Sequence, residues 1–234
     1  MTSIAILSGG LATRLHPITH KTPKALIQIA GKPFLFWQLQ LLKQQGFEHV
    51  IICVGFLGKQ IQNIVGDGDR FGLQIEYSFD GETLLGTGGA LQKALPLLPD
   101  HFFVMYGDSY LPIDYPAVWR AFLKAGKSGL MTVIRNKNQW DKSNAHLLSD
   151  GTVFYDKRHA SDKMEFIDYG LLVLRSSVFK EVAGQGNRPM DLADVLHQLS
   201  KGGGMAGFEV KERFYEIGSR QGIEETERYL FKEE

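Results

Sequence analysis

Cationic side chains and a pair of glycines gather near the start of the chain, in a pattern suited to binding phosphate. An apolar run over 4–7 leads into Gly9 and Gly10, and the loop that follows carries Arg14 and Lys24. Each feature alone usually marks an ordinary turn or a solvated side chain. Together they predict a buried strand that ends in a polyphosphate-binding loop, because glycine lets backbone N–H groups approach an anion closely and the cations add fixed positive charge.

The residue order across this stretch resembles the signature of the sugar-1-phosphate nucleotidyltransferases, also called nucleotide-sugar pyrophosphorylases. That signature is a strand, Gly-Gly-x-Gly-Thr-Arg-Leu and then Pro-Lys-Pro, and this chain carries Ala12 and Ala25 in place of a glycine and the second proline. Alanine reaches positive φ less readily than glycine, so we expect the loop to be slightly displaced but still to bind phosphate. The resemblance implies two catalytic cations and four nucleotide-binding neighbours: Arg14 and Lys24, and Leu7, Gly9, Gly10 and Thr13.

A second glycine-rich stretch, Gly86-Thr87-Gly88-Gly89, follows later in the chain. It fails as a dinucleotide-binding fingerprint, because the third glycine of that motif and the ribose-binding acid after it are missing. The resemblance instead implies a loop whose four residues approach the base and ribose of a nucleotide. A P-loop-like pattern over 121–128 is set aside, since its first residues read as the interior of a helix that ends at Gly126.

Two acidic residues match metal-binding positions of the same family. Asp108 follows the apolar run 102–106, where a lone acid is most often a turn former, but the family's Gly-Asp at this point holds a metal ion. Glu216, in Tyr-Glu-Ile-Gly-Ser, stands where the family usually has aspartate, and glutamate still carries the charge that a hard cation needs. The resemblance therefore implies Mg²⁺ as cofactor. The form Tyr-Glu-Ile-Gly-Ser is associated with the heptose-1-phosphate guanylyltransferase branch.

The second half of the chain offers polar residues at the family's sugar-binding positions. Asp156-Lys157 resembles an acid–lysine pair that contacts sugar hydroxyls and the sugar phosphate, with aspartate shortening the reach of the acid. Without the family pattern, Lys157 and Asp168 would read as parts of a solvated hairpin. The resemblance implies a sugar-phosphate site made of Asn144, Asp156, Lys157, Asp168, Tyr169 and Gly170.

The implied activity is transfer of a nucleotidyl group from a nucleoside triphosphate to a sugar 1-phosphate, with pyrophosphate released. A sugar 1-phosphate is anionic at neutral pH and attacks without a general base, so fixed cations and a divalent metal suffice. We expect GTP with D-glycero-α-D-manno-heptose 1-phosphate or mannose 1-phosphate. One alternative is a uridylyltransferase acting on N-acetylmuramic acid 1-phosphate or another hexose 1-phosphate. Another is a catalytically silent regulatory subunit that senses nucleotide sugars.

Apolar runs alternate with helical patterns through the first half of the chain, which predicts a parallel sheet covered by helices. Ligands bind at the carboxyl ends of such strands, where the first glycine pair and Asp108 both fall. We expect one domain over 1–234, with a nucleotide-binding half over about 1–110 and a sugar-binding half over about 111–234. The expected fold class is α/β: a Rossmann-like, mixed and mainly parallel sheet flanked by helices, with a small β-rich sugar-binding part.

The elements that must position these residues follow from periodicity, caps and turn residues. Helices are predicted from Pro33 to before Gly46 and over 58–65, 89–95, 115–125, 191–199 and from Ser219 onward. Strands are predicted over 4–7, 50–54, 73–78, 102–106, 130–134, 145–148, 152–155, 165–174 (interrupted at 168–170) and 213–217.

The composition is that of an ordinary globular domain of 234 residues, 44% hydrophobic and 22% charged. Lys and Arg number 26, and so do Asp and Glu, so no net charge favours a nucleic acid or a membrane as partner. The single cysteine, Cys53, lies in an apolar run and is expected to be buried and reduced. Since there is no basic leader and no apolar run long enough to span a membrane, we expect a cytoplasmic protein. We expect it to be a monomer or a homodimer.

Overall fold

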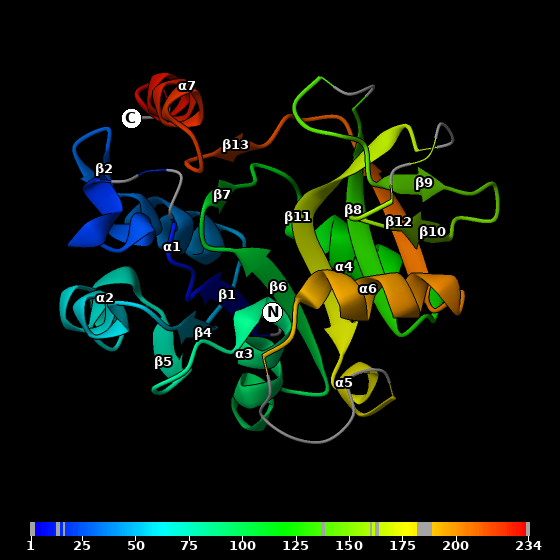
Figure 1. Cartoon of the computed structure of the whole chain (residues 1–234), viewed down its shortest axis with the longest axis horizontal. Helices are drawn as coiled ribbons and strands as arrows, with labels where there is room; N and C mark the ends of the chain where they lie inside the picture. Colours follow the sequence, from blue (N-terminus) through cyan, green and yellow to red (C-terminus); the bar gives the residue numbers. More distant parts are fainter. Residues whose placement is uncertain are drawn as a thin grey trace.

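Parallel strands form the sheet of the first half of the protein. The computed structural model describes residues 3–12, 15, 17–136, 139–159, 161, 164–181 and 189–232. Within these residues the strands lie in the order β5-β4-β1-β6, all parallel (Figure 1). Their bounds are Ile4–Ser8 (β1), His49–Val54 (β4), Gln74–Phe79 (β5) and His101–Tyr106 (β6). The carboxyl ends of these strands therefore meet at one edge of the sheet.

The long strand β11, Phe166–Arg175, pairs antiparallel with β6 and carries the same sheet into the second half. Beyond it, β8 pairs antiparallel with β11, β12 pairs parallel with β8, and the β9–β10 hairpin joins the same sheet. These strands span Gly129–Arg135 (β8), Ala145–Leu147 (β9), Val153–Tyr155 (β10) and Met205–Val210 (β12). The mixed, mainly parallel sheet expected from the sequence is confirmed.

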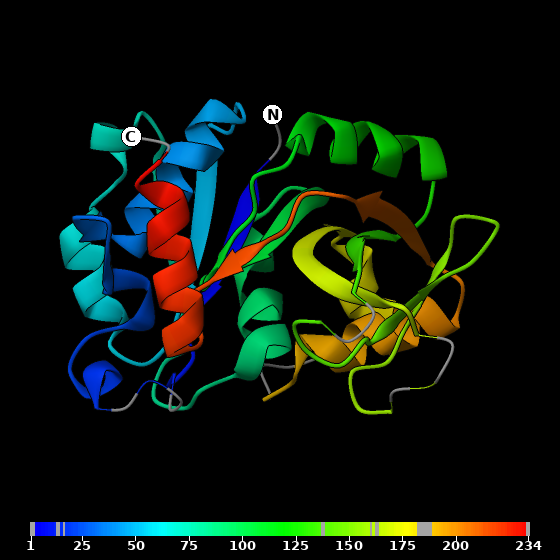
Figure 2. The ribbon, with the colours of Figure 1, turned by 90° about the horizontal axis from the view of Figure 1, so that it is seen from above.

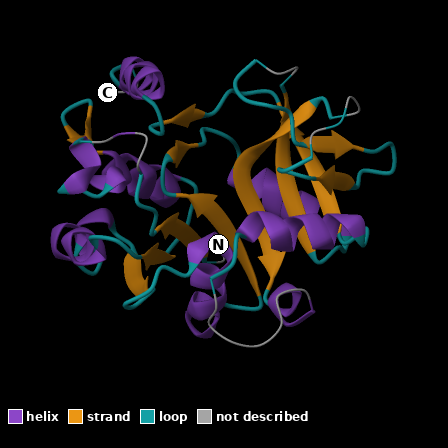
Figure 3. Cartoon of the chain, in the orientation of Figure 1, coloured by secondary structure: helices purple, strands orange, loops and turns teal. Residues whose placement is uncertain are grey.

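Helices lie on both faces of this sheet (Figure 3). The α-helices are Phe34–Gln44 (α1), Gly58–Val65 (α2), Gly86–Ala94 (α3), Tyr115–Ala125 (α4), Ser177–Glu181 (α5), Leu192–Lys201 (α6) and Arg220–Leu230 (α7). Short 3₁₀ turns span Ile18–His20, Lys24–Leu26, Asp69–Phe71 and Leu95–Leu97. Two small ribbons pair Gln28–Ile29 (β2) with Lys32–Pro33 (β3), and Ser109–Tyr110 (β7) with Tyr215–Glu216 (β13).

Alternate residues of each central strand feed two separate hydrophobic cores. Ile4 and Ile6 of β1 belong to the core that α1, α2, α4 and α7 complete, whereas Ala5 and Leu7 belong to the core completed by α3, α5 and α6. Figure 2 shows α4 (green) and α6 (orange) on opposite sides of the β11 region. Because both faces are covered, the strands read as continuous apolar runs. Cys53 is fully buried in the second core, as expected, and burial, followed by the nearby Asp80 charge, raises the pKa of its thiol to about 12.

Most predicted elements are confirmed, but some differ, and α5 and the short strands β2, β3 and β7 were not predicted. Helix α3 begins at Gly86, so the second glycine-rich stretch is the first turn of a helix and not a loop before one. The strand expected over 213–217 is shorter, because only Tyr215 and Glu216 pair with β7. Strand β12 was not predicted at all, since its glycine and its polar residues mask the period of two. Gly126 ends α4 in a left-handed conformation, so the P-loop-like pattern is a helix end.

No helix formed by the described residues has the length and apolar character needed to cross a membrane.

Candidate active site

A two-stranded ribbon brings together the two acidic residues expected to bind metal. Strand β13 runs antiparallel to β7, with Glu216 opposite Ser109 (Figure 1), and the backbone N–H of Ile217 donates to the carbonyl of Asp108 at 3.0 Å. Asp108 and Glu216 line a common cavity of about 510 Å³, together with Lys24 and Gly218. Residues that are far apart in sequence thus meet at the carboxyl end of β6.

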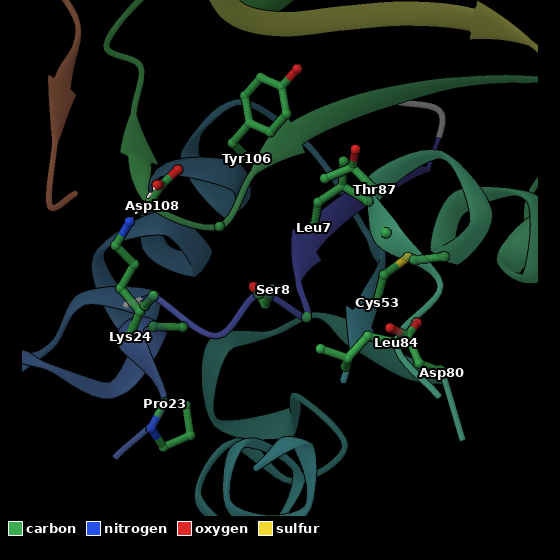
Figure 4. A pocket seen from close by; sticks show the side chains of 17 residues that line it. Leu7, Ser8, Pro23, Lys24, Cys53, Asp80, Leu84, Thr87, Tyr106 and Asp108 are labelled. Carbon is green, nitrogen blue, oxygen red and sulfur yellow. Dashed lines mark hydrogen bonds and ion pairs between the residues drawn. The ribbon is translucent and has the colours of Figure 1, made fainter. Parts of the chain in front are cut away.

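Lys24 and Asp108 form a close ion pair in this cavity. The Lys24 ammonium donates to Oδ2 of Asp108 at 2.6 Å, and the two side chains are 20% and 37% exposed (Figure 4). Lys24 is the first residue of a 3₁₀ turn that follows Pro23, and this turn directs it toward the end of β6. The Lys24 ammonium therefore binds the same carboxylate that is expected to bind a metal ion.

Glu216 lies at the N-terminus of α7. Its carboxylate accepts hydrogen bonds from the Gly218 backbone N–H and, at 2.8 Å, from the Ser219 hydroxyl. Position 222 requires glycine, because a Cβ at Gly222 would lie 2.0 Å from Oε1 of Glu216. The N-terminal end of a helix stabilises a negative charge, so the Glu216 carboxylate is held in place at this edge of the cavity.

The residues of this cavity fit a magnesium ion. Mg²⁺ in phosphate-transfer sites is commonly held by one or two carboxylates, water and the substrate phosphates, which matches Asp108 and Glu216 beside an open cavity. The described residues contain no cluster of three or more His, Cys, Asp or Glu side chains able to hold a metal ion by themselves. A substrate phosphate would therefore have to complete the coordination.

The first glycine turn lines a second cavity, of about 260 Å³, that extends from the Lys24–Asp108 pair toward β4 and α3. It is called the nucleotide cavity below, after the role predicted for its glycines. Leu7, Gly9 and Gly10, which were predicted to bind the nucleotide, line this cavity, whereas Thr13 and Arg14 lie outside the described residues. Ala12 adopts a φ of +50°, so it takes up the left-handed conformation that the family's glycine would favour. Residue 12 therefore has a backbone conformation that glycine adopts more readily than alanine.

Asp80 lies at the far end of this nucleotide cavity from Lys24 (Figure 4). It is 8% exposed, and its Oδ2 accepts the Leu85 backbone N–H at 3.1 Å. Burial raises the pKa of this carboxyl, while the Leu85 hydrogen bond and the Lys93 charge partly oppose the effect. Asp80 was not predicted as a site residue, although it directly follows β5, just as Asp108 comes soon after β6, another parallel strand of the same sheet.

The second glycine-rich stretch divides between the cavity and the protein interior. Gly86 and Thr87 line the nucleotide cavity. The N–H groups of Gly88 and Gly89 instead both donate to the carbonyl of Met190, at 2.9 and 3.2 Å. Gly86 and Thr87 therefore line the cavity, while Gly88 and Gly89 join α3 to the segment before α6. The Thr87 hydroxyl also bonds the start of α6, since it donates to the Asp191 carboxylate at 3.0 Å and accepts the Leu192 N–H at 2.9 Å.

A third cavity, of about 590 Å³, opens on the second half of the protein, and three predicted sugar-binding residues line it: Asp168, Tyr169 and Gly170. It is called the sugar cavity below, after that predicted role. They form the bulge of β11, where the Asp168 carboxylate accepts the Gly170 N–H at 3.0 Å and Gly170 has a φ of +103°. Tyr106 lines both this cavity and the nucleotide cavity, and Glu216 and Gly218 are shared with the metal-site cavity. The three cavities therefore adjoin one another.

The other predicted sugar-binding residues are not among the described residues that line this sugar cavity. Asn144 fixes the bulge, since its side-chain oxygen accepts the Asp168 backbone N–H at 2.9 Å. Asp156 accepts the backbone N–H groups of Arg158 and His159, both at 2.9 Å, so its carboxylate shapes a turn. Lys157 is exposed, and its charge opposes the increase that burial causes in the pKa of Asp168.

Comparison with known proteins identifies the family. The model of the nucleotidyl transferase family matches residues 4–227. The chain belongs to the nucleotidyl transferase family. It is 30% identical over 181 residues to the D-glycero-alpha-D-manno-heptose 1-phosphate guanylyltransferase of Campylobacter jejuni, covering 77% of this chain and 79% of that protein. It is 41% identical over 116 residues to the N-acetylmuramate alpha-1-phosphate uridylyltransferase of Neisseria meningitidis serogroup B, covering 49% of this chain.

The chain spans half the length, 50%, of the Neisseria relative that it matches. Among solved structures, HddC from Yersinia pseudotuberculosis superimposes with a TM-score of 0.81 at 22% identity, covering 98% of this chain and all of that one. At such low identity the likeness shows a shared fold.

The buried carboxyl of Asp168 predicts a pH dependence of stability. Burial raises its pKa to about 6, against opposing contributions from the Gly170 hydrogen bond and the Lys157 charge. The folded nucleotidyl transferase therefore binds this proton more tightly than the unfolded chain, and gains stability as the pH falls through about 6 toward the unfolded value. We expect the free energy of unfolding of the wild type to rise relative to Asp168→Asn between about pH 7.5 and pH 5, measured by denaturant titration. Parallel pH profiles would contradict this assignment.

A buried glutamine on α1 supports the residue that is expected to bind metal. Gln38 is 0% exposed, and its side-chain amide donates to the carbonyls of Tyr106 at 3.1 Å and Ser109 at 2.8 Å, on either side of Asp108. Sequence reasoning did not single it out, although a glutamine on an otherwise apolar helix face is a signal of a buried hydrogen bond.

Replacing Gln38 with leucine is expected to loosen the turn that carries Asp108. Two buried carbonyls would lose their donor, at a cost of about 1–3 kcal/mol each. We expect Gln38→Leu to lower the melting temperature and to raise the Mg²⁺ concentration needed for half-maximal activity. Gln40→Leu, on the exposed face of the same helix, is the matched control. A lower melting temperature with an unchanged Mg²⁺ requirement would leave Gln38 a purely structural role.

Proposed function

We propose that the protein transfers a nucleotidyl group from a nucleoside triphosphate to a sugar 1-phosphate and releases pyrophosphate. The main support is the position of the Lys24–Asp108 pair beside Glu216, where the nucleotide cavity and the sugar cavity meet. A nucleotide at the glycine turn and a sugar at the β11 bulge would bring their phosphates together at this point. Membership of the nucleotidyl transferase family supports the same reaction.

In this reaction an oxygen of the sugar 1-phosphate forms a bond to the α-phosphorus, and the bond from that phosphorus to the β-phosphate oxygen breaks. The nucleophile is already an anion, so the protein has to position and neutralise two polyanions rather than remove a proton. Lys24 is placed to neutralise a phosphate once the triphosphate competes with Asp108 for its ammonium group. Arg14, by the family pattern, would stabilise the leaving pyrophosphate. Mg²⁺, held by Asp108 and Glu216, supplies further neutralisation of the phosphate charge when bound.

Asp80 supports guanine as the base. It places a carboxylate at the end of the nucleotide cavity opposite Lys24, among mainly apolar groups such as Leu84 and Cys53 (Figure 4). Guanine presents two adjacent N–H donors, on N1 and the exocyclic amine, to which a carboxylate can accept paired hydrogen bonds. Uracil presents one N–H between two carbonyl oxygens, which a carboxylate would repel. We therefore propose GTP as the nucleotide.

For the acceptor we propose a heptose or mannose 1-phosphate. Of the two relatives described above, the Campylobacter jejuni protein aligns over the longer part of this chain, and it is named a heptose 1-phosphate guanylyltransferase. A uridylyltransferase acting on N-acetylmuramic acid 1-phosphate is the second candidate, because the relative with the higher identity carries that name.

Pyrophosphate release tests this proposal directly. GTP, UTP, CTP, dTTP and ATP are each combined with heptose, mannose, glucose and N-acetylmuramic acid 1-phosphates in the presence of Mg²⁺, with EDTA as the control. Release with GTP and heptose or mannose 1-phosphate is the expected result. Release only with UTP would establish the uridylyltransferase instead. A protein that binds nucleotide sugars but releases no pyrophosphate from any pair would be a regulatory subunit.

A further inference from the structure

An aromatic wall lines the sugar cavity beyond the β11 bulge. The rings of Trp140 and Phe214 meet edge to face with centroids 5.4 Å apart, and Phe214 meets Tyr169 in the same way at 5.8 Å. All three line the cavity, and Trp140 is 39% exposed. A large aromatic side chain exposed at the rim of a cavity offers an apolar face to a ligand.

The loop that carries Trp140 is held from below by Asn136, which is 0% exposed. The Asn136 side-chain oxygen accepts the Trp140 backbone N–H at 3.2 Å, and its amide nitrogen donates to the carbonyl of Asp141 at 2.7 Å and to the Ser143 hydroxyl at 3.1 Å. A buried side chain whose two polar groups both bond one short segment holds that segment, here residues 140–143, in place. Trp140 is therefore presented by a built turn.

The charge of the sugar cavity is predominantly negative. Asp141, Asp168, Glu216 and Glu225 line it, against a single described cation, Arg213. The guanidinium of Arg213 is already paired with the Glu225 carboxylate at 2.6 Å. Carboxylates accept hydrogen bonds from sugar hydroxyls, whereas they repel a carboxylate carried by a ligand.

Building on the proposed function, we propose that this cavity selects an uncharged sugar and that Trp140 is the platform on which the sugar ring packs. The C–H face of a pyranose would lie against the indole, and its hydroxyls would donate to the acidic groups across the cavity. A sugar that carries a carboxylate would face uncompensated negative charge. The inference thus favours a neutral heptose or hexose over N-acetylmuramic acid as the acceptor.

Binding of nucleotide sugars, measured by isothermal titration calorimetry, tests the charge selection without depending on turnover. Two matched pairs are used: GDP-mannose with GDP-mannuronic acid, and UDP-glucose with UDP-glucuronic acid. The members of each pair differ only in a hydroxymethyl group or a carboxylate at C6. We expect the neutral member to bind at least about tenfold more tightly with whichever base the protein accepts. Equal affinity within a pair would overturn the selection of uncharged sugars.

The role of Trp140 is tested with Trp140→Ala and Trp140→Phe. We expect Trp140→Ala to weaken the binding of the neutral nucleotide sugar about tenfold and to leave the affinity for GDP or UDP alone unchanged, while phenylalanine restores most of the loss. Leu148→Ala, at another exposed apolar residue that does not line the cavity, is the control. Unchanged affinity in Trp140→Ala, or an equal loss for the bare nucleotide, would overturn the platform.

The two proposals fail in different ways. If wild-type protein binds the neutral nucleotide sugars as expected but releases no pyrophosphate, the transferase function fails and the sugar selection stands. If it releases pyrophosphate but Trp140→Ala binds nucleotide sugars normally, the platform fails and the transferase function stands. If no nucleotide sugar binds and no pyrophosphate is released, both are wrong.

Discussion

Replacing Asp108 with asparagine is expected to lower the turnover number at least about 1000-fold while leaving the protein folded. The change is nearly isosteric but removes the negative charge that would hold Mg²⁺, and it also removes the anionic partner of Lys24, 2.6 Å away. A free Lys24 ammonium would still bind phosphate, so the Michaelis constant for the triphosphate should change much less. Pyrophosphate release at increasing Mg²⁺ measures the first effect, and circular dichroism with thermal unfolding checks the fold.

Asp69→Asn serves as the matched control for this substitution. Asp69 lies in a short 3₁₀ turn on the surface and is not among the described residues that line the three cavities. The Asp69→Asn variant should have an unchanged turnover number. Near-normal turnover of Asp108→Asn at saturating Mg²⁺ would mean that the Asp108 carboxylate serves to position Lys24 rather than to bind metal.

Replacing Asp80 with asparagine is expected to reverse the base preference. The variant loses an acceptor for two guanine N–H groups, and hydrogen bonds to a charged group are each worth about 1.5–3 kcal/mol. Its amide can instead donate to a uracil carbonyl and accept from the uracil N–H. We expect the ratio of kcat/KM for GTP to that for UTP to fall at least about 100-fold, measured by pyrophosphate release with one sugar 1-phosphate.

Stability must be measured in parallel for the Asp80 variant, because the same carboxylate accepts the Leu85 N–H at the start of α3. The side-chain oxygen of asparagine can keep that hydrogen bond, so the melting temperature should change little. An equal loss of kcat/KM with GTP and UTP would show that Asp80 only supports the loop before α3.

Much of the fold could be predicted because its signals are local. The predicted helices that start at Asp191 and Ser219 correspond to α6 and α7. Each of these two side chains caps its helix by accepting a hydrogen bond from the first turn, from Ala193 and Gly222 respectively. The helix over 115–125 and the interruption of β11 at 168–170 also follow from short patterns of residues. Apolar runs, caps and turns depend on residues that are close together in sequence, so the sequence alone is enough to predict them.

The site was harder to predict because it is assembled by long-range pairing. The closeness of Asp108 and Glu216 depends on β13 pairing with β7, two strands too short to give a periodic signal. Asp80 could have been found, since it follows a parallel strand as Asp108 does, but no family motif pointed to it. Trp140 gives no signal in the sequence, because its place in the sugar cavity is determined by the buried Asn136.

The pairing of β6 with β11 limits how the protein can move. Main-chain hydrogen bonds join the strands along the register from Leu171–Met105 to Arg175–His101, and they connect the two halves as one continuous body. A hinge between the halves would have to break this ladder, so entry and exit of substrates must rely on loop rearrangement rather than on rotation of domains. For the same reason the halves should not survive separation: a cut near residue 110 would leave β6 and β11 as exposed sheet edges prone to aggregation.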